Sequence, residues 1–270
     1  MKTVSHRSNR RRGGFTLVEV MITLAIVVTV LAMCMSSFLF SMRMMYKDQQ
    51  RLITNASLRS FMAQISKETL DASTFYLFPY YTALDGNVNL TTDPCAPVAP
   101  EIDAAGTEFD KWIAHGDCLV LITKTSEWRS TDIRQIRVYY RLTTNQATVN
   151  NEATIRYYET ADWGEGTSST SNGYPFSSLT TYLNAINLNS NPSISGSKEL
   201  TARCKGRKVA SPYTGYTAGD LYPIFSTESG TANPANGFIS INVEFINGSN
   251  TGTSRLLSSS SFNYTISPRR

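Results

Sequence analysis

The strongest pattern in the sequence is an apolar run that begins at Phe15 and ends at Met42. Between Val20 and Met42 lie 23 residues without a charged side chain, a glycine or a proline. As a helix they would extend roughly 34 Å, which is enough to cross the hydrocarbon core of a bilayer. The pattern therefore predicts a membrane-spanning helix over residues 15–42. A buried core helix is the alternative, which the length of the run and the basic residues before it disfavour.

The helix is predicted to continue past the membrane, because residues 43–72 contain no glycine or proline. Apolar side chains recur there at spacings of three and four residues, at Leu58, Phe61, Met62 and Ile65. This spacing places them along one stripe of a helix. We therefore expect an amphipathic continuation whose stripe packs on a globular head. A coiled coil is disfavoured, since no heptad repeat is sustained.

Beyond Pro79 the apolar positions change to the two-residue period of strands. Apolar and polar side chains alternate over residues 136–142 and 239–245, and shorter strands are predicted at residues 118–122, 153–159 and 262–266. Their spacing favours antiparallel hairpins. The sheet is expected to bury one apolar face under the upper half of the helix. The predicted fold class is α+β, with a long N-terminal helix packed on an antiparallel β-sheet head over residues 73–270.

Residues 160–222 interrupt this pattern, because they are rich in serine, threonine, asparagine, glycine and tyrosine and contain few periodic runs. The expected structure is a loop-rich insertion in the head. Apolar side chains at helical spacing predict one short helix within it, at Leu179, Tyr182, Leu183 and Ile186. Long loops often carry function, and a decorated surface without a ligand is the alternative.

The charge of the chain is concentrated at its N-terminus. The formal net charge is +4, and five basic side chains and no acidic ones stand within residues 1–14. Without this segment the chain has 20 basic and 21 acidic side chains, which is a net charge of −1. The isoelectric point of about 8.8 therefore does not indicate nucleic-acid binding. A basic segment before an apolar helix is a topology signal, which places the N-terminus in the cytoplasm and the head outside it.

Glu19 is the one acidic residue within the apolar run. A carboxylate at the edge of a membrane helix costs roughly a few kcal/mol and indicates a functional role. If the chain is cut after Gly14, Phe15 becomes the new N-terminus. Glu19 could not pair with the new α-amine of its own chain without bending the helix, but it could pair with the amine of a neighbouring copy. A snorkelling acid in a plain membrane anchor is the alternative.

The segment from Arg12 to Met21 reads Arg-Gly-Gly-Phe-Thr-Leu-Val-Glu-Val-Met. It resembles the prepilin cleavage and methylation motif of type IV pilins and type II secretion pseudopilins, over roughly residues 8–42. The resemblance implies that a membrane prepilin peptidase cuts after Gly14 and methylates Phe15. It also implies that Glu19 attracts the amine of the preceding subunit during assembly. Ordinary secretory, lipoprotein and twin-arginine signals each lack a required residue here.

The resemblance further implies a role and a set of partners. The chain is expected to be a structural subunit, a minor pilin or pseudopilin, held by a single span in the bacterial inner membrane before it enters a filament. Its expected partners are prepilin peptidase, other pilin or pseudopilin subunits, an assembly platform with its ATPase, and the lipid bilayer. Ser36 stands where major pilins often have a helix-breaking proline. A pilus, a type II secretion system and a competence system remain open alternatives.

The chain has four cysteines, of which Cys34 lies in the predicted membrane span. The other three, Cys95, Cys118 and Cys204, fall in the head. An oxidising compartment permits one disulfide among them and leaves one thiol over. The short loop that Cys95 and Cys118 bracket favours their pairing, and Cys204 is the alternative partner.

Catalytic, metal-binding and cofactor-binding motifs are not evident in the sequence, so we expect no enzymatic activity, no metal and no cofactor. His115 and Cys118 stand close in sequence at a loop-to-strand junction, without an evident third group to orient them. Ordinary solvated or structural roles are the favoured interpretation of these residues, of the segment 195–198 and of the acidic side chains of Asp103, Glu108 and Asp110.

A binding module at a pilus tip, either an adhesin or a DNA-uptake receptor, is the alternative function. Nucleic-acid binding requires a basic stripe on the surface. The candidate residues for it are Arg134, Arg137, Arg141 and Arg156. Arg137 and Arg141 are expected to share the solvent face of one strand. Cross-strand pairing with acidic side chains is the favoured interpretation, so nucleic acid is not an expected partner.

Overall fold

The computed structural model describes residues 14–90, 92–95, 112–124, 133–142, 153–160, 179–191, 196–200, 204–206, 223–229, 238–247 and 258–266. The chain divides into two compact units, one up to Gln49 and one from Gln50 onward. A single helix, α1 (Leu17–Asp71), contributes to both units. The first unit consists, in its described part, of residues 14–16 and the lower part of this helix.

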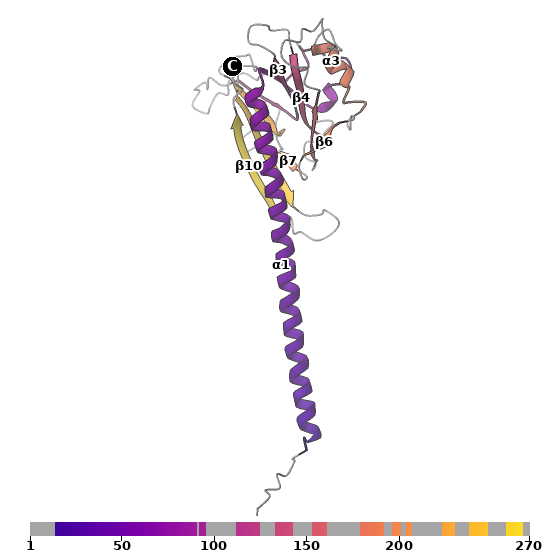
Figure 1. Cartoon of the computed structure of the whole chain (residues 1–270), viewed down its shortest axis with the longest axis vertical. Helices are drawn as coiled ribbons and strands as arrows, with labels where there is room; N and C mark the ends of the chain where they lie inside the picture. Colours follow the sequence, from indigo (N-terminus) through magenta and orange to yellow (C-terminus); the bar gives the residue numbers. More distant parts are fainter. Residues whose placement is uncertain are drawn as a thin grey trace, which may run out of the picture. The chain divides into compact units, whose positions relative to one another are not determined.

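The predicted long helix is confirmed as one unbroken element of 55 residues (Figure 1). At 1.5 Å per residue it extends about 82 Å. Its continuity follows from the absence of glycine and proline between Leu17 and Asp71. In the first unit the large apolar side chains remain exposed, for example Leu17, Leu24 and Met33. In the second unit the predicted stripe is buried, with Phe61 and Ile65 at 1% and 0% exposure.

The predicted antiparallel β-structure is confirmed, and the strands divide between two sheets. Sheet 1 has the strand order β1-β3-β4-β5-β6, and its pairs are all antiparallel. Its strands are β1 (Thr74–Phe78), β3 (Cys118–Lys124), β4 (Ile133–Arg141), β5 (Ile155–Glu159) and β6 (Lys198–Glu199). The predicted hairpin partners at residues 136–142 and 153–159 are therefore neighbours, with Tyr139 opposite Tyr157.

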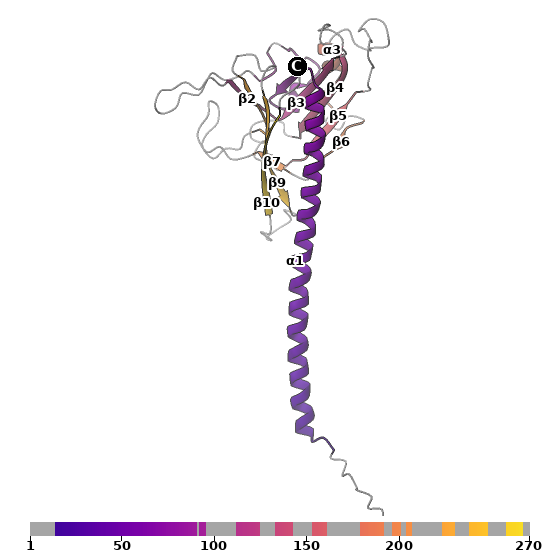
Figure 2. The same ribbon diagram turned by 60° about the vertical axis from the view of Figure 1, so that its left-hand side comes forward.

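Sheet 2 has the strand order β10-β9-β8-β2, and a further strand, β7, also pairs with β9. Its strands are β2 (Trp112–Gly116), β7 (Cys204–Gly206), β8 (Phe225–Ser229), β9 (Phe238–Asn247) and β10 (Ser258–Ile266). The predicted hairpin of the last two strands is confirmed, with Ile239 opposite Ile266. The hydroxyl groups of Ser66 on α1 and Tyr264 on β10 lie 3.1 Å apart, and both views show β10 beside the helix (Figure 2).

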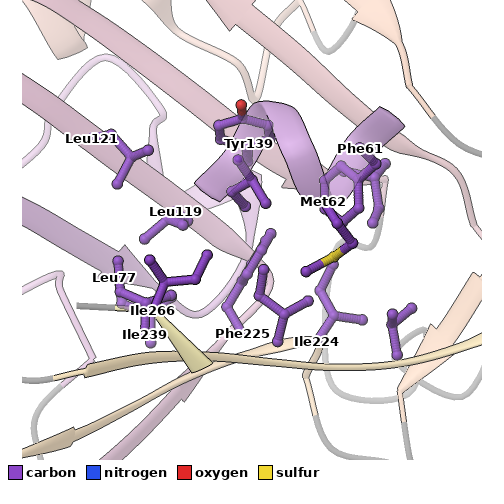
Figure 3. Close-up of a cluster of buried hydrophobic side chains, with 14 of the residues drawn as sticks. Phe61, Met62, Leu77, Leu119, Leu121, Tyr139, Ile224, Phe225, Ile239 and Ile266 are labelled. Carbon is purple, nitrogen blue, oxygen red and sulfur yellow. The ribbon is translucent and has the colours of Figure 1, made fainter. Parts of the chain in front are cut away.

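The first core cluster joins the upper part of α1 to both sheets. Figure 3 shows its side chains, which come from the helix and from the two sheets. The helix supplies Phe61, Met62 and Ile65; sheet 1 supplies Leu77, Leu119, Leu121 and Tyr139; sheet 2 and the residue before it supply Ile224, Phe225, Ile239 and Ile266. Burial of each large apolar side chain contributes about 1.5–3 kcal/mol. The amphipathic stripe therefore holds the helix on the head, as its spacing predicted.

The second core cluster covers the opposite face of sheet 1. It contains the side chains of Val120, Ile136, Val138 and Tyr140, which alternate with those of the first cluster. A short helix, α3 (Leu179–Ile186), packs on this face and confirms the helix predicted from its apolar spacing. The 3-10 helix η1 (Tyr81–Ala83) adds Tyr81.

The expectation that strand 136–142 would bury only one face is therefore wrong. Its apolar side chains pack under α3, while the side chains between them face α1 and the first cluster. Both faces of sheet 1 are covered, so alternation on β4 does not separate core from solvent.

Candidate functional site

The segment from Gly14 to Glu19 lies at the start of α1 and is open to solvent. Gly14 is exposed, and a Cβ built on it would meet no atom within 4 Å among the described residues. Phe15 is 79% exposed, and the helix begins only at Leu17. The peptide between Gly14 and Phe15 is therefore non-helical and accessible, as an endopeptidase requires.

Thr16 caps the helix, because its Oγ1 accepts a hydrogen bond from the Glu19 backbone N–H at 3.3 Å. This is the first half of a capping box, in which a threonine stands three residues before a glutamate. Sequence reasoning treated Glu19 only as a partner for a neighbouring amine and missed the cap, although the Thr-x-x-Glu spacing was its signal. The Glu19 carboxylate stands in the first turn, where the helix dipole favours a negative charge.

The threonine hydroxyl groups in the apolar part of α1 form hydrogen bonds with backbone carbonyls of the same helix. Thr23 Oγ1 lies 2.9 Å from both the Glu19 and the Val20 carbonyl oxygens, to one of which it donates, and Thr29 Oγ1 donates to the Ile26 carbonyl at 2.8 Å. Such bonds satisfy the hydroxyl groups within the helix, which an apolar solvent demands. Among the described residues, α1 is the helix that is long and apolar enough to cross a membrane.

Arg141 is a wrong candidate for a nucleic-acid contact, because its side chain is fully buried. Its Nη2 donates to Asp117 Oδ2 at 2.7 Å, and both side chains are at 0% exposure. Asp117 Oδ1 accepts the Ile224 backbone N–H at 2.9 Å, and the Asp117 N–H donates to the Pro79 carbonyl at the same distance. This ion pair ties the ends of β3 and β4 in sheet 1 to the start of β8 in sheet 2.

The other three arginines do not form a basic stripe with one another. Arg137 is half-buried; it donates to Thr123 and Gln135, and its Nε lies 3.8 Å from Glu68 Oε2. Arg156 donates to Ser197 Oγ at 3.2 Å. Arg134 stands three residues before Arg137, so the strand period places the two on opposite faces of β4. The structure thus uses Arg137 and Arg156 in contacts within the head.

The head cysteines are all thiols in this structure, with Cys118 and Cys204 buried and Cys95 partly buried. Cys95 packs against the first core cluster, whereas Cys118 lies in the second. Cys204 lies in the first cluster, as the alternative pairing would require, but the pairing stays a prediction. Burial raises the pKa of the Cys95 and Cys204 thiols to about 12. Burial also raises the pKa of Cys118, so none of the three is an activated nucleophile.

The remaining candidates for chemistry are ordinary in their surroundings or outside the described residues. Within the described ranges, no group of three or more His, Cys, Asp or Glu side chains is placed to hold a metal ion. Asp103, Glu108, Asp110 and Ser195 lie outside those ranges. His115 is a β2 residue whose carbonyl accepts the Cys95 Sγ–H at 2.9 Å.

A long N-terminal helix packed on antiparallel sheets is an α+β, pilin-like architecture. The comparisons with known proteins agree with this class. Residues 9–35 match the family model described as the prokaryotic N-terminal methylation motif, which is the signature of type IV pilins and pseudopilins. The match covers the whole of the Gly14–Glu19 segment. Comparison with curated proteins and with solved structures finds no match for the chain.

The motif implies processing by a prepilin peptidase and assembly with other pilins. The proteins that carry it are structural rather than enzymatic. Together with the apolar helix, it fits a single-pass, membrane-anchored pilin-like protein.

Proposed function

We propose that the chain is a minor pilin or pseudopilin, a structural subunit of a type IV pilus-like or type II secretion filament. In this proposal residues 1–14 are a cytoplasmic leader, residues 15–42 span the inner membrane, and residues 43–72 continue the helix into the extracytoplasmic head of residues 73–270. The observation that carries the proposal is the coincidence of the methylation motif with an open Gly14–Phe15 peptide and an apolar helix without cover.

The exposed apolar side chains in the lower part of α1 must be covered either by lipid or by the helices of neighbouring subunits. Side chains such as Phe15, Leu24 and Met33 are 64–79% exposed in the isolated chain, so water is a poor solvent for this segment. Lipid covers it before assembly. Neighbouring helices cover it in a filament. The free energy of moving its apolar side chains from lipid to a protein interface is close to zero, because lipid tails are equally apolar. A specific interaction is therefore needed to favour the filament and set its register.

Glu19 supplies that interaction in the proposed mechanism. Cleavage after Gly14 removes five basic side chains and creates a positive α-amine on Phe15, which the same peptidase methylates. The amine of one subunit pairs with the Glu19 carboxylate of the next. This neutralises a charge that would otherwise be costly in an apolar environment. The platform and ATPase encoded elsewhere would supply the work of extraction.

A minor rather than a major role is supported by the size of the mature chain and of its head. The mature chain would have 256 residues, and residues 160–222 add α3, β6 and β7 to the head. The competing proposal of a DNA-uptake receptor is weakened, because Arg141 is buried and Arg137 and Arg156 make contacts within the head.

The first experiment tests cleavage. Replacement of Gly14 by a bulky residue should block processing, because the peptidase must approach this peptide closely. Co-expression with a prepilin peptidase, followed by mass spectrometry, should show a variant that keeps its 14-residue leader while the wild type loses it and gains one methyl group. Cleavage of the wild type at any other peptide would contradict the assignment.

The second experiment tests assembly. Glu19→Ala should remain inserted in the membrane and be cleaved, yet enter sheared filaments at least tenfold less than the wild type. Glu244→Ala is the matched control, since it removes a glutamate from a partly exposed ion pair of the head. Equal incorporation of Glu19→Ala and Glu244→Ala would refute the pairing with the α-amine.

A further inference from the structure

A buried carboxylate sits where α1 packs on sheet 1. Glu68 is 8% exposed, and it is the charged residue among the buried side chains of α1, which also include Phe61, Ile65 and Thr69. Its Oε2 accepts the Tyr139 hydroxyl, and its Oε1 accepts the Gln64 side-chain amide at 3.0 Å. The Tyr157 hydroxyl also lies 3.0 Å from Oε1. A buried carboxylate persists in a fold only when such donors replace its water.

The Tyr157 hydroxyl lies within hydrogen-bond distance of two carboxylates but has one proton to donate. Its hydroxyl oxygen lies 2.6 Å from Glu159 Oε2 and 3.0 Å from Glu68 Oε1. A phenol has a single O–H donor, so it can donate to only one of these acceptors at a time. The shorter distance indicates that the proton points mainly toward Glu159. Glu68 then has a weaker hold on β5 than its position would allow.

The sheet register arranges these groups in a square. On the face toward α1, Arg137 stands opposite Glu159, and Tyr139 stands opposite Tyr157. Glu68 reaches this square from the helix, 3.8 Å from the Arg137 Nε. Glu159 is the exposed corner, whereas Tyr157 and Glu68 are buried. The square thus links a surface carboxylate on β5 to a buried carboxylate on α1 through one hydroxyl group.

We propose that Tyr157 is a hydrogen-bond switch that couples the surface residue Glu159 to the attachment of α1 on the head. When the charge of Glu159 is neutralised, its pull on the Tyr157 proton weakens and the hydroxyl turns to Glu68. The helix gains a hydrogen bond to a buried charge, which is among the stronger kinds in proteins. The attachment of residues 61–69 to sheet 1 becomes tighter.

The two acceptors also leave their mark on the phenol. Burial, then the hydrogen bond to Glu159 and the charge of Glu68, raise the pKa of Tyr157 well above its ordinary value. Tyr157 therefore keeps its proton at neutral pH. The switch works by reorientation of that proton, without gain or loss of it.

In a filament, a lysine or arginine of a neighbouring subunit placed against Glu159 would have the neutralising effect. This consequence rests on the proposed function, but the switch itself does not. A subunit would then hold its head more firmly on the helix once packed than before. The force that extraction applies to the helix would be transmitted to the head through the tightened contact.

The test uses hydrogen exchange on the full chain in detergent, where no filament is needed. Glu159→Gln removes the surface charge and keeps the size of the side chain. It should slow amide exchange of residues 61–69 by about tenfold, since a factor of ten corresponds to about 1.4 kcal/mol, near the lower end for a hydrogen bond to a charged group. Unchanged or faster exchange would overturn the proposal.

Two further variants test whether the slower amide exchange depends on the Tyr157 hydroxyl. In a Tyr157→Phe background, Glu159→Gln should no longer slow exchange, because the shared hydroxyl is gone. If Tyr157→Phe folds poorly, Glu68→Met provides the same comparison from the other end, since it removes the acceptor oxygens to which the hydroxyl turns and keeps an unbranched side chain. Slowing that persists in these backgrounds would refute the coupling. The matched control, Glu199→Gln, neutralises an exposed glutamate of the neighbouring strand and should leave exchange unchanged; slowing there would show a general surface-charge effect instead.

Discussion

The buried pair of Asp117 and Arg141 makes the sharpest prediction about the stability of the head. Asp117→Asn keeps the size of the side chain and the oxygen that accepts the Ile224 N–H, but it removes the negative charge. The Arg141 guanidinium would then be a cation at 0% exposure without its counter-charge at 2.7 Å. Loss of one partner of a buried ion pair costs about 3–5 kcal/mol. Since domains are stable by about 5–15 kcal/mol, the variant should lose a large part of its stability.

The assay is urea denaturation of the protein in detergent, followed by tyrosine and tryptophan fluorescence. The matched control is Glu244→Gln, which removes a carboxylate from the partly exposed pair with Lys205 at 3.6 Å. Exposed pairs contribute about 0–1 kcal/mol, so this variant should be nearly as stable as the wild type. The double variant Asp117→Asn/Arg141→Met should recover part of the loss, because no charge is left buried. Equal costs for the two carboxylate variants, or a double variant with additive losses, would refute the reasoning.

Three further predictions concern the close packing of the head, its thiols and the start of the helix. Gly116→Ala should destabilise the head by about 1–3 kcal/mol, because a Cβ there would lie 2.2 Å from the Phe78 carbonyl oxygen; a wild-type melting temperature would contradict this contact. Cys204 should resist alkylation at pH 8 and react about tenfold faster per pH unit up to its pKa of about 12, which mass spectrometry of labelled peptides can follow; a rate that levels off near pH 9 would show an ordinary thiol. Thr16→Ala should cost the first turn of α1 about 0.5–2 kcal/mol, seen as faster amide exchange near Glu19, and Thr16→Ser should restore protection; equal exchange in both variants would exclude the cap.

Elements whose pattern is local were predictable from the sequence. The absence of glycine and proline over residues 17–71 and the three-and-four spacing from Leu58 to Ile65 were sufficient for α1 and its buried stripe. The same spacing predicted α3 inside a region otherwise poor in pattern. The methylation motif was readable because its residues are contiguous in the sequence. Period and contiguity are properties of a chain segment and require no knowledge of distant residues.

The surroundings of Arg137 and Arg141 could not be predicted from the local pattern. Arg137 and Arg141 alternate with apolar residues on β4, which is the pattern of a strand with one solvent face. The pattern does not show that a second layer covers the polar side. That layer consists of α1 and sheet 2, whose residues are far from β4 in the sequence, and Asp117 and Glu68 supply the charges that make burial of the arginines tolerable.

The sequence by itself therefore determined the methylation motif, the long helix and the antiparallel strands of this protein. The tertiary structure decided that the strands form two sheets, that both faces of sheet 1 are buried, and that the Tyr157 hydroxyl lies within hydrogen-bond distance of both Glu68 and Glu159. The physical reason is the range of the interactions. Helix and strand periods follow from backbone geometry within a few residues, whereas a buried charge is fixed by partners brought together only when the chain folds.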